Sequence, residues 1–218
     1  MKNKKHILFD LDGTLTDPGL GITKSVRYAL KAFDIEVNSL EELYVFIGPP
    51  LMSSFQEYYH FSENDAKKAV EKYREYFSET GIFENVVYSG IKDILKDLRA
   101  SGKKLYLATS KPEIFARKIL ERFELLSYFS FVGGSLLTGE RSEKEDVIQY
   151  VTENIPDFSS DDAVMIGDRK YDILAAKACK IKSIGVAFGY GSLEELKKAD
   201  ADYIAETIEE LCTLLLSR

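Results

Sequence analysis

The sequence predicts an α/β protein: a doubly wound parallel sheet with a small inserted α-helical domain. Short runs rich in β-forming residues alternate with helical patterns along most of the chain, which is typical of a parallel sheet covered on both faces. Between residues 10 and 104 no convincing strand is found, and this interval is too long for an ordinary connection, so a separate domain is expected there. The 218 residues are 45% hydrophobic, enough for a core domain and a small accessory domain.

Six runs predict the strands of the sheet. The first is Lys5–Phe9; the basic residues of MKNKKHILFD are typical of a signal peptide, but Asp10 ends the apolar run too early for one. The others are 105–109 (LYLAT), 128–132 (YFSFV), 163–167 (AVMIG), 183–188 (SIGVAF) and 202–206 (DYIAE). Because ligands bind at the carboxyl ends of parallel strands, the residues after these runs are the candidates for function.

Helical signals lie between the runs. One face of a helix is predicted by the spacing of four apolar residues, Ile91, Ile94, Leu95 and Leu98, and Gly102 is placed to stop that helix. Pro112 is expected to open the next helix, and Ser142 to cap another.

Residues 17–83 are expected to form the inserted helical domain, and residues 1–16 and 84–218 the α/β core. In SENDAKKAVEKYREYF, Ser62 and Asp65 form a capping pair, and the apolar residues fall on one helix face. Pro49-Pro50 in IGPPL would start another helix after a tight turn.

Composition limits the partners. Acidic residues outnumber basic ones by 36 to 29, and the net charge of −7 argues against a nucleic-acid polymer or an anionic membrane as main partner, while allowing a small phosphorylated ligand. No stretch approaches the roughly 18 to 20 apolar residues of a membrane span. Cys179 and Cys212 have no disulfide-framework or zinc spacing, so both are expected to be packing residues in a cytoplasmic protein.

Two aspartates, Asp10 and Asp12, follow the first strand in HILFDLDGTLTD. Like charges at the end of a core strand are unfavourable unless a cation or a proton is shared between them. A calcium loop of the EF-hand type is excluded, because Leu15 and Gly21 stand where that loop needs glycine and glutamate. The remaining interpretation is a magnesium ion bound by hard oxygen ligands, with one carboxylate free to act as a nucleophile.

The sequence lacks the residues that several other enzyme classes require. Only two histidines exist, His6 and His60, and neither suits a Ser-His hydrolase, so both are expected to be structural or exposed. No phosphate-binding glycine-lysine loop is present, and Gly189 and Gly191 lack the third glycine of a dinucleotide fingerprint.

Further polar residues stand at strand ends and helix starts. The strand 163–167 runs into Asp168, with Asp172 four residues on; Asp172 could equally well be a helix cap. Thr109 and Ser110 end the strand 105–109, where hydroxyls and a following helix N-terminus can bind phosphate or simply cap the helix. Lys144 could balance the acids, although a lysine in the run RSEKED is ordinarily solvated. Together these residues are consistent with a phosphoryl-transfer site.

In this order DLDGTLTD, ATSKP, Lys144 and GDRKYD resemble the four motifs of the haloacid dehalogenase superfamily, over essentially the whole chain. The core would then be the Rossmann-like core of that family, and the inserted domain resembles its type-one helical cap. FIGPPL and YREYFSETGIFEN in the cap resemble the phosphoglycolate phosphatase and 5′-nucleotidase-like members.

The resemblance implies a role for each motif residue. Asp10 would be the nucleophile and Asp12 the general acid and base. Mg²⁺ would be bound by Asp10, Asp168 and the backbone carbonyl of Asp12, with Asp172 supporting these ligands. The phosphate would be held by Thr109, Ser110, Lys144 and the backbone at Gly13, although many relatives have asparagine where this chain has Ser110.

The implied function is a Mg²⁺-dependent phosphatase that hydrolyses small phosphomonoesters, phosphoglycolate or a nucleoside 5′-monophosphate, through a phosphoaspartyl intermediate. A β-phosphoglucomutase-like phosphomutase is the alternative, and a non-catalytic phosphoacceptor module is a weaker one. Dehalogenases and the ATPases of the superfamily are disfavoured, because they lack an acid at the position of Asp12. The cap is expected to close over the site, with the IGPPL turn, Arg27 or Arg74 as candidates for substrate choice. Whether the chain is a monomer or a homodimer stays open.

Overall fold

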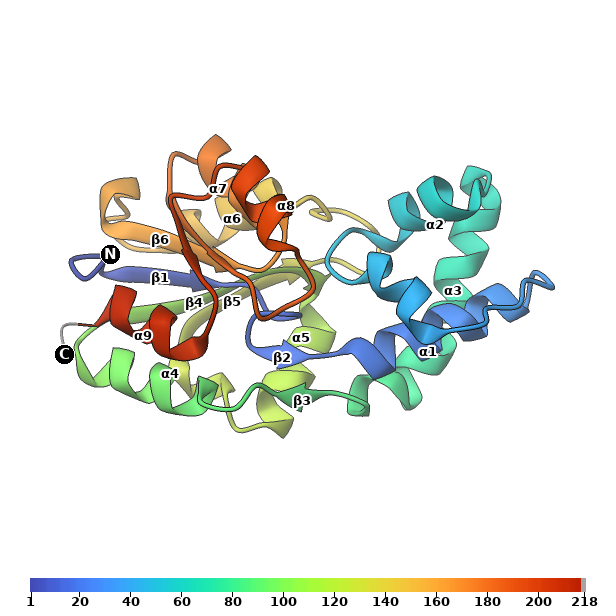
Figure 1. Ribbon diagram of the computed structural model, residues 1–218, viewed down its shortest axis with the longest axis horizontal. Helices are drawn as coiled ribbons and strands as arrows, with labels where there is room; N and C mark the ends of the chain where they lie inside the picture. The colour runs from blue at the N-terminus through green and yellow to red at the C-terminus, as the bar shows by residue number, and fades with distance from the viewer. Residues whose placement is uncertain (217–218) are drawn as a thin grey trace. The chain divides into compact units, whose positions relative to one another are not determined.

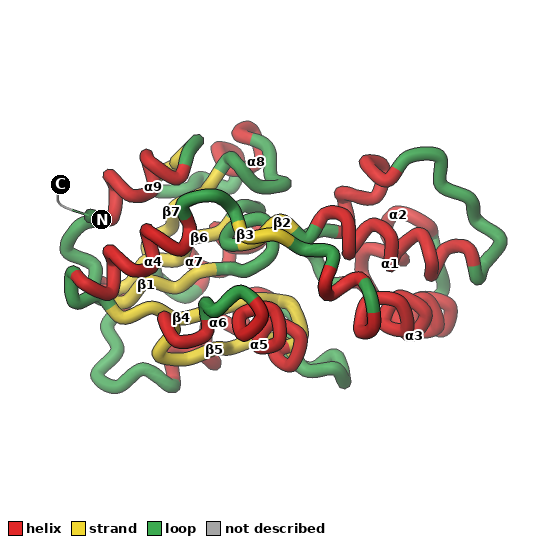
Figure 2. Tube along the Cα trace, turned by 90° about the horizontal axis from the view of Figure 1, so that it is seen from below, coloured by secondary structure: helices red, strands yellow, loops and turns green. Residues whose placement is uncertain are grey.

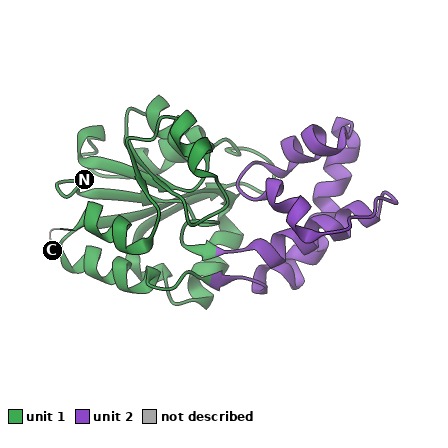
Figure 3. Cartoon of the chain, viewed as in Figure 1, with its two compact units in different colours: residues 1–16, 87–218 green, residues 17–86 purple. Residues whose placement is uncertain are grey.

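The computed structural model describes residues 1–216, and they divide into two compact units. Unit 1 comprises Met1–Thr16 and Val87–Arg218, and unit 2 comprises Asp17–Val86 (Figure 3). The sequence led us to expect the inserted domain over residues 17–83, and unit 2 spans residues 17–86.

Unit 1 contains a six-stranded sheet whose neighbouring strands run parallel, in the order β5-β4-β1-β6-β7-β8. The predicted doubly wound α/β fold is therefore confirmed, since strand order reverses beside β1 and helices cover both faces. All six expected strands are present: β1 (His6–Phe9), β4 (Lys104–Pro112), β5 (Phe129–Ser135), β6 (Ala163–Gly167), β7 (Lys182–Val186) and β8 (Tyr203–Ala205).

The helices form one layer on each face of the sheet. Contacts with the strands place α6 (Lys144–Glu153) and α7 (Lys170–Ala178) on one face, with α8 (Leu193–Lys198) beside α7. The other face is covered by α4 (Ile91–Ala100), α5 (Glu113–Arg122) and α9 (Ile208–Leu215), as Figures 1 and 2 show from two directions. Because side chains alternate along β1, Leu8 packs in the α6/α7 layer while Ile7 and Phe9 are buried towards the opposite face.

Most expected helix boundaries are confirmed. Helix α4 buries the four apolar residues of the predicted face, and Pro112 is the residue before α5. The expectation for Ser142 is wrong: Glu143 is the N-cap of α6, without a side-chain cap. Asp146 and Glu145 lie in the first turn of α6, where negative charge favours a helix start, so the cap hydroxyl is dispensable.

Unit 2 is built from helices α1 (Gly19–Lys31), α2 (Leu51–Tyr59) and α3 (Glu63–Glu79) and from the short 3₁₀ segments η1 (Leu40–Phe46) and η2 (Gly81–Phe83). Ser62 caps α3 by accepting a hydrogen bond from the Asp65 N–H at 3.1 Å, and Pro50 precedes α2, as expected. The core of unit 2 includes Phe46 and Phe55, whose rings lie 5.0 Å apart.

One feature of this region was not expected. The sequence suggested no strand between residues 10 and 104, but β2 (Thr16–Asp17) and β3 (Val86–Val87) pair as a small two-stranded sheet. Two-residue strands carry no alternating pattern that a sequence could reveal. They lie where the chain passes between the two units.

Candidate active site

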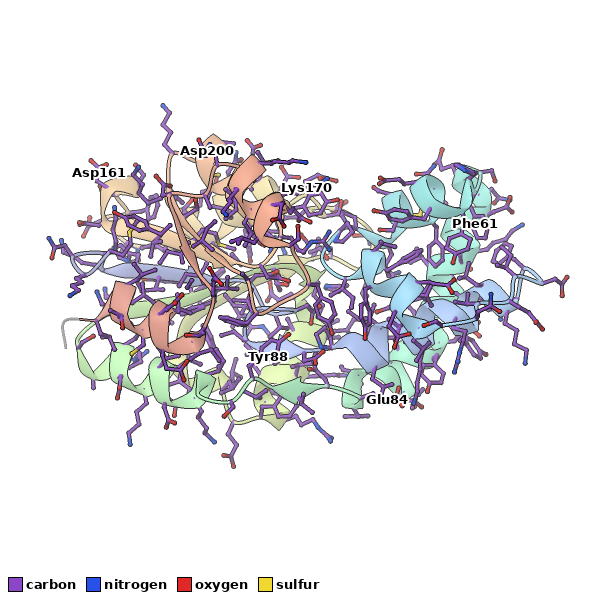
Figure 4. All side chains as sticks on the ribbon, viewed as in Figure 1. Phe61, Glu84, Tyr88, Asp161, Lys170 and Asp200 are labelled. Carbon is purple, nitrogen blue, oxygen red and sulfur yellow. The ribbon has the colours of Figure 1, made fainter. Side chains whose placement is uncertain are left out.

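The candidate residues of the sheet meet at the carboxyl ends of β1, β4 and β6. Asp10 continues β1 by donating its N–H to the Ile166 carbonyl of β6 at 2.9 Å, and Asp168 directly follows β6. Thr109 lies near the end of β4, the other neighbour of β1. In Figure 4, Asp161 and Lys170 mark the two ends of β6, and the site lies at the Lys170 end.

Three buried carboxylates converge there. Oxygen atoms of Asp10, Asp168 and Asp172 all lie within 4.8 Å of one another. Lys144, at the start of α6, joins two of them: its Nζ is 2.8 Å from Asp10 Oδ1 and 2.8 Å from Asp172 Oδ1. The same ammonium donates to the Ala108 carbonyl at 3.0 Å. Lys144 is 6% exposed, so this lysine belongs to the site and is not the solvated residue that the run RSEKED suggested.

The charges in this cluster shift one another's pKa values. Burial by itself would lower the pKa of Lys144, but the carboxylates of Asp10 and Asp172 outweigh it and raise that pKa. Burial raises the pKa of Asp172 to about 6; the charge of Asp10 adds to this effect, and Lys144 opposes it. Lys144 is therefore charged at neutral pH and partly neutralises the carboxylates.

Asp172 has a second contact that the sequence had left as an alternative. Its Oδ2 accepts the Arg169 N–H at 3.1 Å, which caps the start of α7. Both interpretations of this residue therefore hold: it caps a helix and takes part in the acidic cluster.

Asp168 has one carboxylate oxygen that is held and one that is free. Its Oδ2 accepts the Tyr190 N–H at 2.7 Å, whereas its buried Oδ1 has no hydrogen-bond partner among residues 1–216. Burial, followed by the charges of Asp172 and Asp10, raises the pKa of Asp168 well above its ordinary value. A divalent cation among these oxygens would satisfy the free atom and offset the repulsion, so the residues fit a hard metal ion.

Asp12 stands apart from the three converging carboxylates. Its Oδ2 lies 2.5 Å from Nζ of Lys111, and its buried Oδ1 accepts no hydrogen bond within the described chain. Burial raises the pKa of Asp12, and Lys111 opposes this shift. Since its side chain is held by Lys111, the expected contribution of Asp12 to a metal is through its backbone carbonyl.

Gly13 lies directly against Asp168. The backbone of Gly13 has a φ of +79°, and a Cβ atom there would lie 2.1 Å from Asp168 Oδ2. Only glycine fits both the conformation and the space. The structure thus gives Gly13 a contact with an acidic residue of the site in addition to its expected closeness to phosphate.

Thr109 and Ser110 end β4 in different environments. Thr109 is buried, and its Oγ1 accepts the Lys111 N–H at 3.3 Å. Ser110 is half-buried, and its carbonyl accepts the Ser135 hydroxyl at 2.8 Å. Neither contact occupies the donor capacity of the two hydroxyls, which is what binding a phosphate requires.

Sequence reasoning missed two parts of this site. Lys111 was overlooked: it follows Thr109 by two positions, where the register between β4 and β5 shifts, so regular strand alternation does not predict where its side chain points. Gly189 was considered only as part of a failed dinucleotide motif, whereas a Cβ there would lie 2.2 Å from the Gly13 carbonyl and 2.5 Å from Asp168. The loop after β7 therefore packs on the site through its backbone.

The remaining candidates lie elsewhere. His6 is buried at the start of β1 with its Nδ1 3.2 Å from the Tyr106 hydroxyl, and His60 is exposed at the end of α2. Both cysteines are free. Arg27 is exposed on α1 and Arg74 is half-buried on α3, and their part in substrate choice stays a prediction. Across residues 1–216, none of the helices combines the length and the apolar character that crossing a membrane requires.

Comparisons with known proteins extend over most of the chain. The family model described as haloacid dehalogenase-like hydrolase matches residues 7–186. A solved structure of a predicted phosphatase from Clostridium acetobutylicum is 51% identical, covers 97% of each chain and superposes with a TM-score of 0.95.

Three curated relatives have different names. A 5′-nucleotidase of Pseudomonas aeruginosa is 45% identical over 192 residues, or 88% of this chain and 86% of that protein. The tyrosine-protein kinase PtkA of Mycobacterium tuberculosis is 34% identical over 207 residues, which cover 94% of this chain and 70% of that protein. A phosphoglycolate phosphatase of Vibrio parahaemolyticus is 29% identical over 215 residues, which cover 95% and 94%.

Proposed function

Because the chain belongs to the haloacid dehalogenase-like hydrolases and is a phosphoric monoester hydrolase, we propose that it is a Mg²⁺-dependent phosphatase of small phosphorylated metabolites. The observation that carries this proposal is the group of three converging carboxylates, Asp10, Asp168 and Asp172, with Lys144 among them and Asp12 held separately. Such a site can bind a metal ion, and it places a nucleophile and an acid side by side at the carboxyl ends of the strands.

The proposed reaction has two steps. An oxygen of Asp10 attacks phosphorus and forms an Asp–O–P bond, while the bond from phosphorus to the ester oxygen breaks. The electron pair of that bond stays on the leaving oxygen, which takes a proton from Asp12. In the second step Asp12 accepts a proton from water as the water oxygen bonds to phosphorus; the bond between Asp10 and phosphorus breaks, its electron pair returns to the Asp10 carboxylate, and inorganic phosphate is released.

Other residues orient the phosphate and balance charge. Lys144 fixes Asp10 through the 2.8 Å ion pair and presents positive charge to the phosphoryl oxygens. The hydroxyl of Thr109 and the amide groups that follow Asp10 would hold those oxygens during transfer. A bound Mg²⁺ ion, held by Asp10, Asp168 and the carbonyl of Asp12, would reduce the repulsion between the anionic nucleophile and the anionic substrate.

We propose a nucleoside 5′-monophosphate as the first substrate to test and phosphoglycolate as the second. The relative named 5′-nucleotidase is 45% identical to this chain, against 29% for the relative named phosphoglycolate phosphatase. The earlier alternatives make different products: a phosphomutase would isomerise a sugar phosphate, and a phosphoacceptor module would keep its phosphoaspartate.

The test measures release of inorganic phosphate from a panel of nucleoside 5′-monophosphates, phosphoglycolate, sugar phosphates and an aryl phosphate. We expect turnover with Mg²⁺, loss of turnover with EDTA, and none in Asp10→Asn under either condition. Absence of phosphate release from the whole panel would contradict the proposal. Isomerised sugar phosphate would then indicate a mutase, and stable phosphorylation of Asp10 without turnover would indicate a phosphoacceptor.

A further inference from the structure

Lys111 is a buried charged residue to which the proposed reaction gives no task. Its side chain is 5% exposed, and its ammonium lies 2.5 Å from Oδ2 of Asp12, whose own side chain is 11% exposed. A buried ammonium group is strongly unfavourable unless a carboxylate compensates it. The ion pair therefore offsets part of the cost of burying both charges.

An irregularity in β4 places Lys111 at this point. Thr109 pairs with Gly134 and Pro112 pairs with Ser135, so Ser110 and Lys111 are extra residues on the β4 side of the ladder. Close packing fixes the distortion, because a Cβ at Gly134 would lie 2.6 Å from the Lys111 carbonyl. Bulges of this kind re-aim side chains, and they are common next to active sites.

The ion pair engages only one of the two carboxylate oxygens of Asp12. Lys111 takes Oδ2, and the buried Oδ1 has no hydrogen-bond partner in the part of the chain that the structure describes. An acid and base must present one defined oxygen to the group with which it exchanges a proton. A carboxylate anchored on one side by a rigid ion pair meets this requirement, whereas an unanchored one could rotate about its side-chain bonds.

We propose that Lys111 is a positioning residue for Asp12: the ion pair fixes one carboxylate oxygen so that the other faces the leaving group of the substrate. This inference rests on the proposed function, since it assigns a task within that reaction. It predicts that the need for Lys111 depends on the leaving group. A simple alkoxide needs a proton to leave, whereas a nitrophenolate is stable enough to leave without one.

The experiment compares two substrates in the Mg²⁺-loaded full-length enzyme, a nucleoside 5′-monophosphate and p-nitrophenyl phosphate. For Lys111→Met we expect kcat/KM, which reports the step in which the leaving group departs, to fall by at least about tenfold more on the nucleotide than on the nitrophenyl ester, because general acid catalysis contributes about 10²- to 10⁴-fold. Lys111→Arg keeps the cation and should recover part of the loss on the nucleotide. Lys118→Met, a change at an exposed lysine on α5, should leave the ratio of the two rates at its wild-type value.

A double mutant distinguishes positioning from a general structural effect. In an Asp12→Asn background, Lys111→Met should not change the ratio further, because the group that Lys111 positions is already inactive. Equal losses on both substrates in Lys111→Met, or a further change of the ratio in the double mutant, would overturn the inference while leaving the phosphatase proposal intact. A wild-type enzyme inactive on both substrates would instead overturn both. Circular dichroism of each variant shows whether it is folded, and Lys111→Gln, which removes the charge but keeps a polar side chain, serves as the test if Lys111→Met is not.

Discussion

At the scale of single residues, Asp12 and Asp168 share one arrangement. One carboxylate oxygen of Asp12 accepts a hydrogen bond from Lys111, and one of Asp168 accepts a hydrogen bond from the Tyr190 N–H. The second oxygen of each is buried and has no hydrogen-bond partner among residues 1–216. Unsatisfied buried oxygens are rare in folded proteins and are found where a ligand completes the site. Oδ1 of Asp12 is thus the oxygen available for the proposed proton transfer, and Oδ1 of Asp168 is the oxygen available to the proposed metal ion.

Replacing the nucleophile tests the assignment of Asp10. Asp10→Asn keeps the shape of the side chain but removes the attacking carboxylate, so turnover should fall by roughly 10⁴-fold or more. The variant should remain folded, because an amide can still accept a hydrogen bond from Lys144. Steady-state phosphate release and circular dichroism check the two halves of this prediction. A folded variant that retains turnover would remove Asp10 from its proposed role.

His6 predicts a pH dependence of stability that is unrelated to the site. Burial lowers the pKa of His6; Lys104 and Lys5 act in the same direction, and Asp162 opposes them. Because the unfolded chain then binds a proton more readily than the folded chain, stability is lost as pH falls from the ordinary value near 6.5 through the lower folded value. Between about pH 7.5 and pH 5, urea unfolding should show a smaller loss for His6→Gln than for the wild type. The exposed His60→Gln serves as the control and should follow the wild type.

How far single residues were predictable depends on their pattern. Asp10, Asp168 and Thr109 stand at the ends of apolar runs, and a parallel sheet brings strand ends together, so the sequence could point to them. Lys144 and Lys111 are cations in polar stretches, and their sequence surroundings do not distinguish them from solvated lysines. Their burial depends on how α6 and β4 pack, which only the folded chain specifies.

At the scale of elements, the loop after β7 is the segment whose role was least visible in the sequence. It carries Gly189, which packs on the carbonyl of Gly13, and the Tyr190 N–H, which holds Asp168. Strands and helices could be recognised from periodicity and capping residues, since those signals are local. The contacts of a loop are made by backbone groups that every sequence has, so no residue type reveals them.

Gly189→Ala tests whether this loop supports the metal site. The added methyl group would lie 2.2 Å from the Gly13 carbonyl, so the loop must move and the hydrogen bond to Asp168 should weaken. Overpacking of this kind typically costs about 1–3 kcal/mol of stability, and we expect a weaker apparent affinity for Mg²⁺ in addition. Mg²⁺ titrations of thermal unfolding and of phosphate release check both expectations.

Gly102→Ala is the control for a loss of stability that arises away from the site. Gly102 has a positive φ of +82°, which Gly189 does not, and a Cβ atom there meets nothing within 4 Å, so the alanine adds backbone strain without a clash. This variant should lose some stability and keep the Mg²⁺ dependence of the wild type. If both variants shift the Mg²⁺ dependence equally, the loop has no special part in holding Asp168.

At the scale of the whole molecule, the chain leaves unit 1 after Thr16 and returns to it at Val87. The sequence could predict an inserted unit because a long strandless interval is incompatible with a compact crossover. The insertion's second limit was less visible, since β3 is only two residues long. The insertion interrupts no strand of the six-stranded sheet of unit 1, so the strands that carry the site residues stay part of one continuous sheet.

The strongest whole-molecule consequence of the site is a link between metal binding and unfolding. Four buried carboxylates, Asp10, Asp12, Asp168 and Asp172, face two ammonium groups, Lys111 and Lys144, so the fully ionised cluster would carry a formal charge of −2. Burial and the repulsion between the carboxylates oppose full ionisation and raise the pKa values of Asp12, Asp168 and Asp172. This repulsion destabilises the metal-free fold, and a bound divalent cation would balance it. A cation that binds only the folded chain stabilises it by about 2.7 kcal/mol at a concentration 100 times its Kd. For a chain of this size, that corresponds to a rise in Tm of roughly 5–10 °C.

Asp168→Asn separates this effect from nonspecific salt stabilisation. The amide oxygen can still accept the Tyr190 N–H, but one negative charge is gone. The variant should therefore unfold at a higher temperature than the wild type in EDTA, because repulsion is relieved, and should gain little from Mg²⁺, because a ligand is lost. A higher Tm in EDTA together with a smaller gain from Mg²⁺ is specific to a charged metal site, because a surface salt effect would raise the Tm of the wild type and of the variant alike. Calorimetry with and without Mg²⁺ measures both changes. Equal Mg²⁺ responses of the two proteins would exclude Asp168 as a ligand.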